Sequence, residues 1–426
     1  MTSKNKGGKD MKRLIIVLSI ILFLPSIALA GKGGGNTQPT APWPMFGNNP
    51  QHTGQSSYAG PSAGTVKWDV NTGMQGNGSN SVVIGQDKIV YVAGHIYNTV
   101  TLVEDDFLAA YNPDGTLKWQ SLLYNNTAHS YDSTSAISST GTIYVTTYSS
   151  ASLTRYLHAV SPSGEILWQT FLGGTPLPVS TITVGKDGTI YVPGTELTAV
   201  NPDGTIKWMY YCNYCSSIAM SPEGNAIYTV MSESYNGNLS LVALNSNGGT
   251  LWNLPLGESG YGIRYHNPIA VADNGTIYVH SIWDNIVYLS AVTPSGTEKW
   301  RFATDGLYYR STLVPSVSKN GNIYFLIGDV GLTNTAKIYK LDSRGRLKWT
   351  YTINDNCQNN GPAIDANENI YVGSDDGTVY SFTSGGALRW SVIPPNANYF
   401  WGNSPALGSD GRLYIKSTSY LYSIGQ

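Results

Sequence analysis

Residues 187–208, DGTIYVPGTELTAVNPDGTIKW, contain the unit from which the rest of the chain is built. Two runs rich in β-branched residues, 189–192 and 197–200, precede a third run that ends at Trp208. Asp-Gly and Asn-Pro-Asp-Gly supply the backbone conformations that reverse the chain between the runs. The segment therefore predicts three strands of an antiparallel meander, and residues 180–184 supply a fourth strand before them.

This unit recurs along the whole chain. The closing Trp appears eight times, 40 to 51 residues apart, at Trp68, Trp119, Trp168, Trp208, Trp252, Trp300, Trp349 and Trp390. A strand-like run centred on Tyr also appears eight times, at Tyr91, Tyr144, Tyr191, Tyr228, Tyr278, Tyr324, Tyr371 and Tyr414. A period in the forties with four short strands per unit indicates a β-propeller, because such units bury their faces only by stacking around an axis.

The two ends of the chain complete the count. The last unit reaches Gln426 without a Trp strand, while the first Trp strand, residues 65–70, precedes any unit of its own. We therefore expect an all-β, eight-bladed β-propeller of four-stranded antiparallel blades. Its ring closes where residues 65–70 join the C-terminal blade, which leaves no open sheet edge.

The N-terminal segment has the features of an export signal. Lys12 and Arg13 precede an apolar run, residues 14–29, that ends in an A-x-A motif. We expect a secretory signal peptide over residues 1–30, cleaved after Ala30, then a flexible leader over residues 31–42 and the propeller over residues 43–426. A membrane anchor is the alternative, but the run is short for one and contains Pro25. No Cys lies at the cleavage point, so we expect a secreted or periplasmic protein with no lipid anchor and no membrane span in the mature chain.

Composition fits an exported β-protein. The chain is 41% hydrophobic and 12% aromatic, and only 12% of its residues are charged. The formal net charge of −2 gives no electrostatic reason to expect nucleic acid or an anionic membrane as a partner.

Residues 43–56, WPMFGNNPQHTGQS, form an irregular segment that we expect to pack against the ring. This segment, followed by repeats such as Ala-Val-Asn-Pro-Asp-Gly-Thr-Ile-Lys-Trp, resembles the secreted bacterial and archaeal proteins with quinoprotein-like (PQQ-like) propeller repeats. The resemblance runs from Trp43 to Gln426 and implies eight blades whose outer-strand tryptophans dock between neighbouring blades. The family includes cofactor-dependent dehydrogenases and non-catalytic scaffolds, among them the lipoprotein of the outer-membrane β-barrel assembly machinery.

With the strands of each unit labelled A to D, the short A–B and C–D turns fall on one face, which we call the turn face. The variable D–A and B–C connections share the opposite face, the loop face, and binding sites are most often built from such loops on a rigid scaffold. Its D–A connections are rich in aromatic and cationic residues, the types that anchor interfaces. Packing of these residues across the mouth of the propeller is the structural alternative. The candidate partner-binding residues are Tyr261, Arg264, Tyr265, His266, Tyr308, Tyr309, Arg310, Tyr399, Phe400 and Trp401.

The same face holds further aromatic and acidic residues. Tyr210, Tyr211 and Tyr214 are expected in another D–A loop. Three adjacent acids, residues 104–106, are of a type that binds Ca²⁺, but without an acid–spacer–acid–Gly pattern we expect a solvated loop and no metal site. Asp365 begins a similar acidic stretch in an A–B position, where we expect a turn.

The cysteines predict one disulfide. In an exported protein, Cys212 and Cys215 most simply pair with each other and leave Cys357 as a thiol. The quinoprotein dehydrogenases that the repeat resembles carry an adjacent Cys-Cys pair beneath the cofactor, and this chain has none, so we expect no bound cofactor. The six His are scattered and no catalytic motif is present, which predicts a protein that is not an enzyme.

We therefore expect a non-catalytic binding or scaffold propeller that engages a protein or carbohydrate partner through its loop face. One alternative is a PQQ-dependent or other small-molecule oxidoreductase with its site in the propeller funnel. Another is a structural cell-surface spacer.

Overall fold

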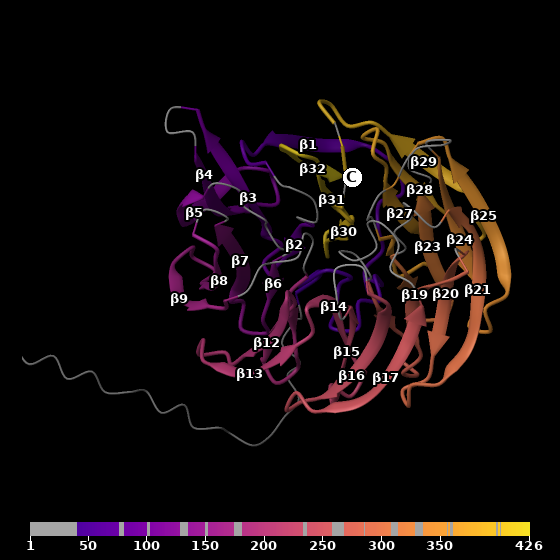
Figure 1. Cartoon of the computed structure of the whole chain (residues 1–426). Coiled ribbons are helices and arrows are strands. Elements are labelled where there is room, and N and C mark those ends of the chain that lie inside the picture. The colour runs from indigo at the N-terminus through magenta and orange to yellow at the C-terminus, as the bar shows by residue number, and fades with distance from the viewer. Residues whose placement is uncertain are drawn as a thin grey trace, which may run out of the picture. The chain divides into compact units, whose positions relative to one another are not determined.

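The computed structural model describes residues 41–426 apart from 76–80, 100–102, 128–134, 150–151, 174–180, 233–236, 258–267, 285, 308–313, 329–334, 356, 358–360, 398 and 401. The expected signal peptide and most of the leader lie outside these ranges. Within them, 32 strands form six four-stranded sheets and one eight-stranded sheet, with no helix among them (Figure 1). The described part of the chain thus holds no helix that is long and apolar enough to cross a membrane.

The unit that contains residues 187–208 forms one of the four-stranded sheets. Its strands are β10 (Thr183–Val184), β11 (Ile190–Val192), β12 (Glu196–Val200) and β13 (Ile206–Tyr211), each paired antiparallel with the next. They are the expected A, B, C and D strands, and in Figure 1 the A strands lie innermost and the D strands outermost.

The other sheets repeat this order. The units before the quoted one are β2 (Val83–Ile84), β3 (Val90–Asn98), β4 (Val103–Tyr111) and β5 (Leu117–Thr127), then β6 (Ala136–Ile137), β7 (Ile143–Ser149), β8 (Thr154–Val160) and β9 (Ile166–Phe171). Two later units are β22 (Ser316–Val317), β23 (Ile323–Gly328), β24 (Ala336–Leu341) and β25 (Leu347–Ile353), then β26 (Ala363–Ile364), β27 (Ile370–Gly373), β28 (Val379–Phe382) and β29 (Leu388–Val392).

The eight-stranded sheet contains two units joined by one parallel bridge between Gly257 and Ile282. Its strands are β14 (Tyr214–Met220), β15 (Ala226–Ser232), β16 (Leu239–Asn245), β17 (Thr250–Gly257), β18 (Ala270–Val271), β19 (Ile277–Trp283), β20 (Ile286–Val292) and β21 (Glu298–Leu307). Tyr210 and Tyr211 end β13 and Tyr214 begins β14. The expectation of an aromatic loop here is wrong, because the two strands extend until only Cys212 and Asn213 remain between them.

The last sheet combines both ends of the described chain. β30 (Ala406–Leu407), β31 (Leu413–Lys416) and β32 (Tyr420–Ile424) supply its first three strands, and β1 (Val66–Asn71) pairs antiparallel with β32 as the fourth. The first and last inner strands, β2 and β30, also contact each other.

The tryptophans of the outer strands link successive units. The indole Nε1 of Trp168 donates to the carbonyl of Pro202 in the next unit's C–D turn at 3.0 Å. A Cβ on the neighbouring Gly204, which has φ +89°, would lie 2.9 Å from that indole, so the turn admits only glycine against the ring. The corresponding donor–acceptor pairs are Trp68–Pro113, Trp119–Pro162, Trp208–Ser246, Trp252–Pro294, Trp300–Ser343, Trp349–Ser384 and Trp390–Pro61.

Inside each unit, the Tyr of the second strand packs against the Trp of the outer strand. Tyr191 and Trp208, for example, have ring centroids 5.9 Å apart. The Tyr is buried whereas the Trp lies half-buried on an outer strand whose other residues alternate between exposed and covered positions. The recurring Tyr and Trp are therefore core residues of the repeat and not parts of a binding site.

Candidate functional site

The turn face is built from nearly identical turns. In the quoted unit, Asp187 accepts a hydrogen bond from the Thr189 N–H at 3.0 Å, and Asp203 accepts one from the Thr205 N–H at the same distance. Gly188 and Gly204 complete these turns with positive φ. Because the turns of successive units are so similar, a partner would find few differences in surface between one unit and the next on this face.

The buried carboxylate of Asp365 organises the acidic A–B turn between β26 and β27. It accepts hydrogen bonds from the Asn367 and Asn369 N–H groups, both at 2.8 Å, and from the Tyr371 hydroxyl at 3.0 Å. Gly60 N–H, at 3.0 Å, connects it to the segment before β1. The stretch forms a turn whose carboxylate fastens the N-terminal segment.

The segment over residues 43–58, which we call the strap, runs along the inner strands on the turn face. In Figure 1 it is part of the indigo trace that crosses the centre of the view between the sheets. Inner strands donate N–H groups to strap carbonyls at 2.7–2.8 Å in the bonds Ile84–Trp43, Ile137–Pro44, Met220–Pro50, Val271–Gln51, Val317–Thr53 and Ile364–Gly54. The strap thus contacts units from nearly the whole length of the chain.

Strap side chains fill the space between the inner strands. Trp43, Met45 and Phe46 are buried, and Trp43 packs in one core cluster with residues of β2 and β30. His52 is also buried; its Nε2 lies 3.1 Å from the Thr183 hydroxyl, and burial lowers its pKa to about 3. The His52 imidazole and three apolar side chains are therefore buried between the strap and the inner strands at this end.

A polar pocket of about 530 Å³ lies between the strap and three turns of the turn face. Its lining is mostly hydroxyl, amide and charged groups, among them Thr53, Ser57, Asp273, Lys319 and Glu368. Hydrogen bonds lower the pKa of Glu368 although burial opposes the shift.

On the loop face, most candidate residues from the sequence lie outside the described ranges: Tyr261, Arg264, Tyr265, His266, Tyr308, Tyr309, Arg310 and Trp401. Tyr399 is described and 65% exposed. Phe400 is fully buried and packs edge-on against Tyr422 at 6.0 Å. Its side chain belongs to the core, which removes it from the exposed candidates.

The structure adds a cation–aromatic cluster that the sequence analysis missed. The guanidinium of Arg301 lies 5.2 Å from the Trp283 ring centroid and 5.6 Å from that of Tyr288, and its Nε donates to Glu298 at 2.9 Å. Trp283 ends β19 at the loop face, and its unit lies between the two candidate connections 258–267 and 308–313. These residues lie on three consecutive strands of one unit and meet only through strand register, so no sequence motif revealed them.

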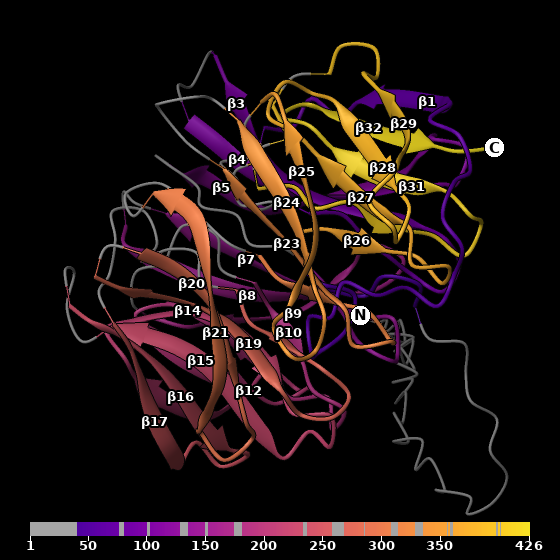
Figure 2. The same cartoon turned by 90° about the vertical axis from the view of Figure 1, so that its right-hand side faces the viewer.

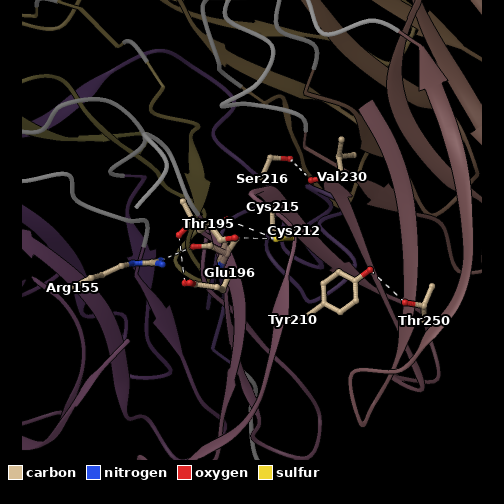
Figure 3. The surroundings of a disulfide bond; sticks show 11 residues. Arg155, Thr195, Glu196, Tyr210, Cys212, Cys215, Ser216, Val230 and Thr250 are labelled. Carbon is tan, nitrogen blue, oxygen red and sulfur yellow. Dashed lines mark hydrogen bonds between the residues drawn. A yellow bond between two sulfur atoms is a disulfide. The ribbon is translucent and has the colours of Figure 1, made fainter. Parts of the chain in front are cut away.

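Cys212 and Cys215 form a disulfide at the crossover from β13 to β14 (Figure 3). Cys357 is a buried thiol. The Cys215 N–H donates to Gly194 O at 2.9 Å, which ties the crossover to the preceding B–C connection. Arg155 extends to the same connection, where its Nη2 donates to Pro193 O at 2.5 Å. Burial lowers the pKa of Arg155 to about 10, and the nearby Glu196 carboxylate opposes that shift.

Three buried hydroxyls lie at the loop-face ends of neighbouring inner strands. They belong to Ser135, Thr181 and Ser217, and none has a hydrogen-bond partner in the described structure. A buried hydroxyl without a partner costs free energy unless water or a ligand satisfies it. Water or another small polar molecule at these strand ends would satisfy the three hydroxyls.

The acidic residues 104–106 do not form the expected solvated loop. They lie in β4, paired with β3, and Asp106 is 1% exposed. Glu104 lies 3.8 Å from the buried His95. Over the described residues, no group of three or more His, Cys, Asp or Glu side chains could hold a metal ion.

The resemblance to quinoprotein repeats suggests pyrroloquinoline quinone as a cofactor, but the described residues do not fit it. Pyrroloquinoline quinone carries three carboxylates, which require cationic partners. The two buried Lys and Arg side chains of the described chain, Lys416 and Arg155, donate to backbone carbonyls. Cys212 and Cys215 are separated by two residues and do not provide an adjacent pair. We therefore derive no reaction step through this group.

The repeat, the stacked four-stranded sheets and the interlocking tryptophans define a β-propeller with PQQ-like repeats. The chain belongs to the family described as outer membrane protein assembly factor BamB, whose model matches residues 153–281 and 237–392. No curated protein matches the sequence.

Solved structures share the fold at low sequence identity. A europium-containing methanol dehydrogenase aligns with a TM-score of 0.65 at 12% identity, over 89% of each chain. BamB from Moraxella catarrhalis aligns with a TM-score of 0.59 at 13% identity, over 85% of this chain and all of that one. The Dos1 propeller aligns with a TM-score of 0.63 at 9% identity, over 85% and 95%. An enzyme and an assembly factor thus share this architecture, and fold alone does not select a function.

Proposed function

We propose that this protein is an eight-bladed propeller that acts without catalysis and binds a protein or carbohydrate partner on its loop face. Three contacts support eight blades in a closed ring: β1 pairs with β32, β2 contacts β30, and Trp390 donates to Pro61 at 3.4 Å beside β1. In this arrangement each Trp reaches the next blade, and no blade is left without a neighbour.

The strap is the observation that carries the proposal. Its buried aromatic and apolar side chains pack against the inner strands on the turn face, where the remaining surface repeats from blade to blade. The variable connections lie on the loop face. The loop face carries exposed Tyr399, and Trp283 of the Arg301 cluster ends β19 there. Aromatic and Arg side chains supply most of the binding energy in typical interfaces.

The family supports a protein partner, since its description is that of an assembly factor. We also propose that the protein works outside the cytoplasm, secreted or periplasmic, after cleavage behind Ala30. The basic, apolar and A-x-A sequence of residues 12–30 supports this location.

The experiment compares two double variants in extracts of the native host. Tyr309→Ala with Arg310→Ala alters the loop face, whereas Asp187→Ser with Asp203→Ser alters matched exposed turns on the turn face. We expect the first pair to reduce partner capture at least about tenfold, because it removes two hot-spot side chains, and the second pair to leave capture unchanged. Mass spectrometry identifies the partner and circular dichroism confirms folding. Equal capture by both folded variants would contradict a loop-face site.

The second candidate function is that of a small-molecule oxidoreductase. The third is that of a structural cell-surface spacer, which would bind no partner on either face. The unpaired hydroxyls of Ser135, Thr181 and Ser217 favour a small polar ligand near the axis. Native mass spectrometry of the purified protein distinguishes these functions, since a bound small molecule adds a defined mass without any protein partner.

A further inference from the structure

The strap contacts follow one rule. In six units, the N–H that points to the strap belongs to the last residue of the inner strand: Ile84 of β2, Ile137 of β6, Met220 of β14, Val271 of β18, Val317 of β22 and Ile364 of β26. An inner strand is a sheet edge, and its N–H groups require partners when buried. The strand ends therefore form a groove of backbone donors that matches the carbonyls of one chain folded through several turns.

We propose that this groove is a peptide-binding site, that the strap is its ligand carried in the same chain, and that the groove also binds the strap sequence when it is supplied as a separate peptide. The inference goes beyond the proposed function and concerns the opposite face. Its ligand class is a peptide folded through turns, with a buried aromatic residue at its N-terminal end and a positive-φ glycine near its C-terminal end.

The strap has the internal order of a preformed ligand. Gly54 N–H donates to Gly47 O at 2.8 Å, and Asn49 exchanges two hydrogen bonds with Thr53, at 2.7 and 3.1 Å. These contacts are local to the strap and do not need the sheets. Preorganisation of this kind lowers the entropic cost of docking a separate peptide.

The groove selects its ligand at Gly54. This residue has φ +66°, and a Cβ there would lie 2.5 Å from Ser316 Oγ and 2.8 Å from Pro362 O. Any side chain would therefore meet both strain and backbone contact. Ala59 is exposed and provides a position within the peptide where a small change should have no effect on binding.

The connection from the strap to β1 offers a place to separate them. Ser62 is exposed, while Pro61 on its strap side accepts a hydrogen bond from the Tyr371 hydroxyl at 3.2 Å. A protease site inserted between Ser62 and Ala63 can be cut in the folded protein. The cut leaves β1 paired with β32, so the test does not depend on a strapless chain being able to fold.

The test adds a fluorescent synthetic peptide of residues 41–60 to the cut, folded protein and measures its binding by fluorescence anisotropy. We expect saturable one-to-one exchange with the resident strap. The unlabelled parent and Ala59→Ser peptides should compete equally, and a Gly54→Val peptide should compete at least about tenfold more weakly.

Two results would overturn the proposal. One is that no labelled peptide enters the cut protein, even at denaturant concentrations that leave the sheets folded, because the strap would then be an inseparable part of the core. The other is that the Gly54→Val peptide competes as well as the parent, because binding would then not use the groove.

Discussion

At the scale of single residues, the repeat is held by contacts between a Trp and a glycine of the next unit. A Cβ at Gly296 would lie 2.7 Å from the Trp252 ring, and the residue has φ +83°. Gly296 lies four residues before Trp300, and each contributes to a different interface. Gly296 packs against Trp252 of the preceding unit, and Trp300 packs against Gly345 of the following one.

The first prediction separates the two costs at such a glycine. Gly296→Ala should lower the free energy of unfolding by about 2–5 kcal/mol, because positive φ costs about 1–2 and overpacking about 1–3. Gly73 has φ +67° with open space around a Cβ, so Gly73→Ala should cost only about 1–2 kcal/mol. Urea denaturation measures both variants, and equal losses would show that the Trp contact contributes nothing.

The second prediction concerns buried histidines. His158 Nε2 lies 2.9 Å from the Thr147 hydroxyl, and burial lowers the pKa of His158 to about 4. Between the ordinary value of about 6.5 and this pKa, the unfolded chain binds more protons than the folded one. The contribution of neutral His158 to the free energy of unfolding is therefore fully present above about pH 6.5 and is lost as the pH falls towards 4.

Urea unfolding at pH 7 and pH 5 tests this dependence. In a folded His158→Gln variant, the loss of stability between the two pH values should be smaller than in the parent chain. An unchanged loss would mean that His158 is protonated in the native protein without penalty.

At the scale of elements, the sequence predicts the strands well, because alternating β-branched residues and Gly-containing turns are local signals. The run around Tyr191 occurs as expected, and the expected strand through Trp208 occurs but continues to Tyr211. Local sequence signals fail where tertiary contacts decide. β13 and β14 extend through Tyr211 and Tyr214, and Asp106 is buried in a strand pair.

The candidate site was less predictable than the fold. Burial of Phe400 depends on its packing against Tyr422, and the cluster of Arg301 with Trp283 depends on strand register. The strap has no periodicity, because its partners are the ends of inner strands hundreds of residues apart in the chain. Sequence alone therefore indicated that the strap packs on the sheets but not where it lies.

The third prediction concerns β1. Deletion of residues 61–70 removes the strand paired with β32 and the Trp68 contact to the next unit. The melting temperature should fall by many degrees and the protein should self-associate through the exposed edge of β32. Deletion of the leader residues 31–40 is the control and should change neither property. Calorimetry and light scattering measure both, and parent-like behaviour of the first deletion would contradict the placement of β1.

At the scale of the whole molecule, the two faces differ in kind. The turn face combines repeated turns with a strap that packs on the ends of the inner strands, and its polar pocket lies between the strap and the turns. Figure 2, a side view, shows that the strands of each sheet run between the turn face and the loop face. A partner that reads the variable connections therefore approaches from the loop face.

The most direct test places a photo-reactive phenylalanine analogue at one site on each face of the purified, full-length protein. The loop-face position is Tyr399, which is 65% exposed, and the turn-face position is Ser57, which is also exposed. After irradiation in native-host extract, we expect the partner identified by mass spectrometry to be cross-linked from position 399 and not from position 57. Cross-linking of that partner from position 57 alone would contradict the account.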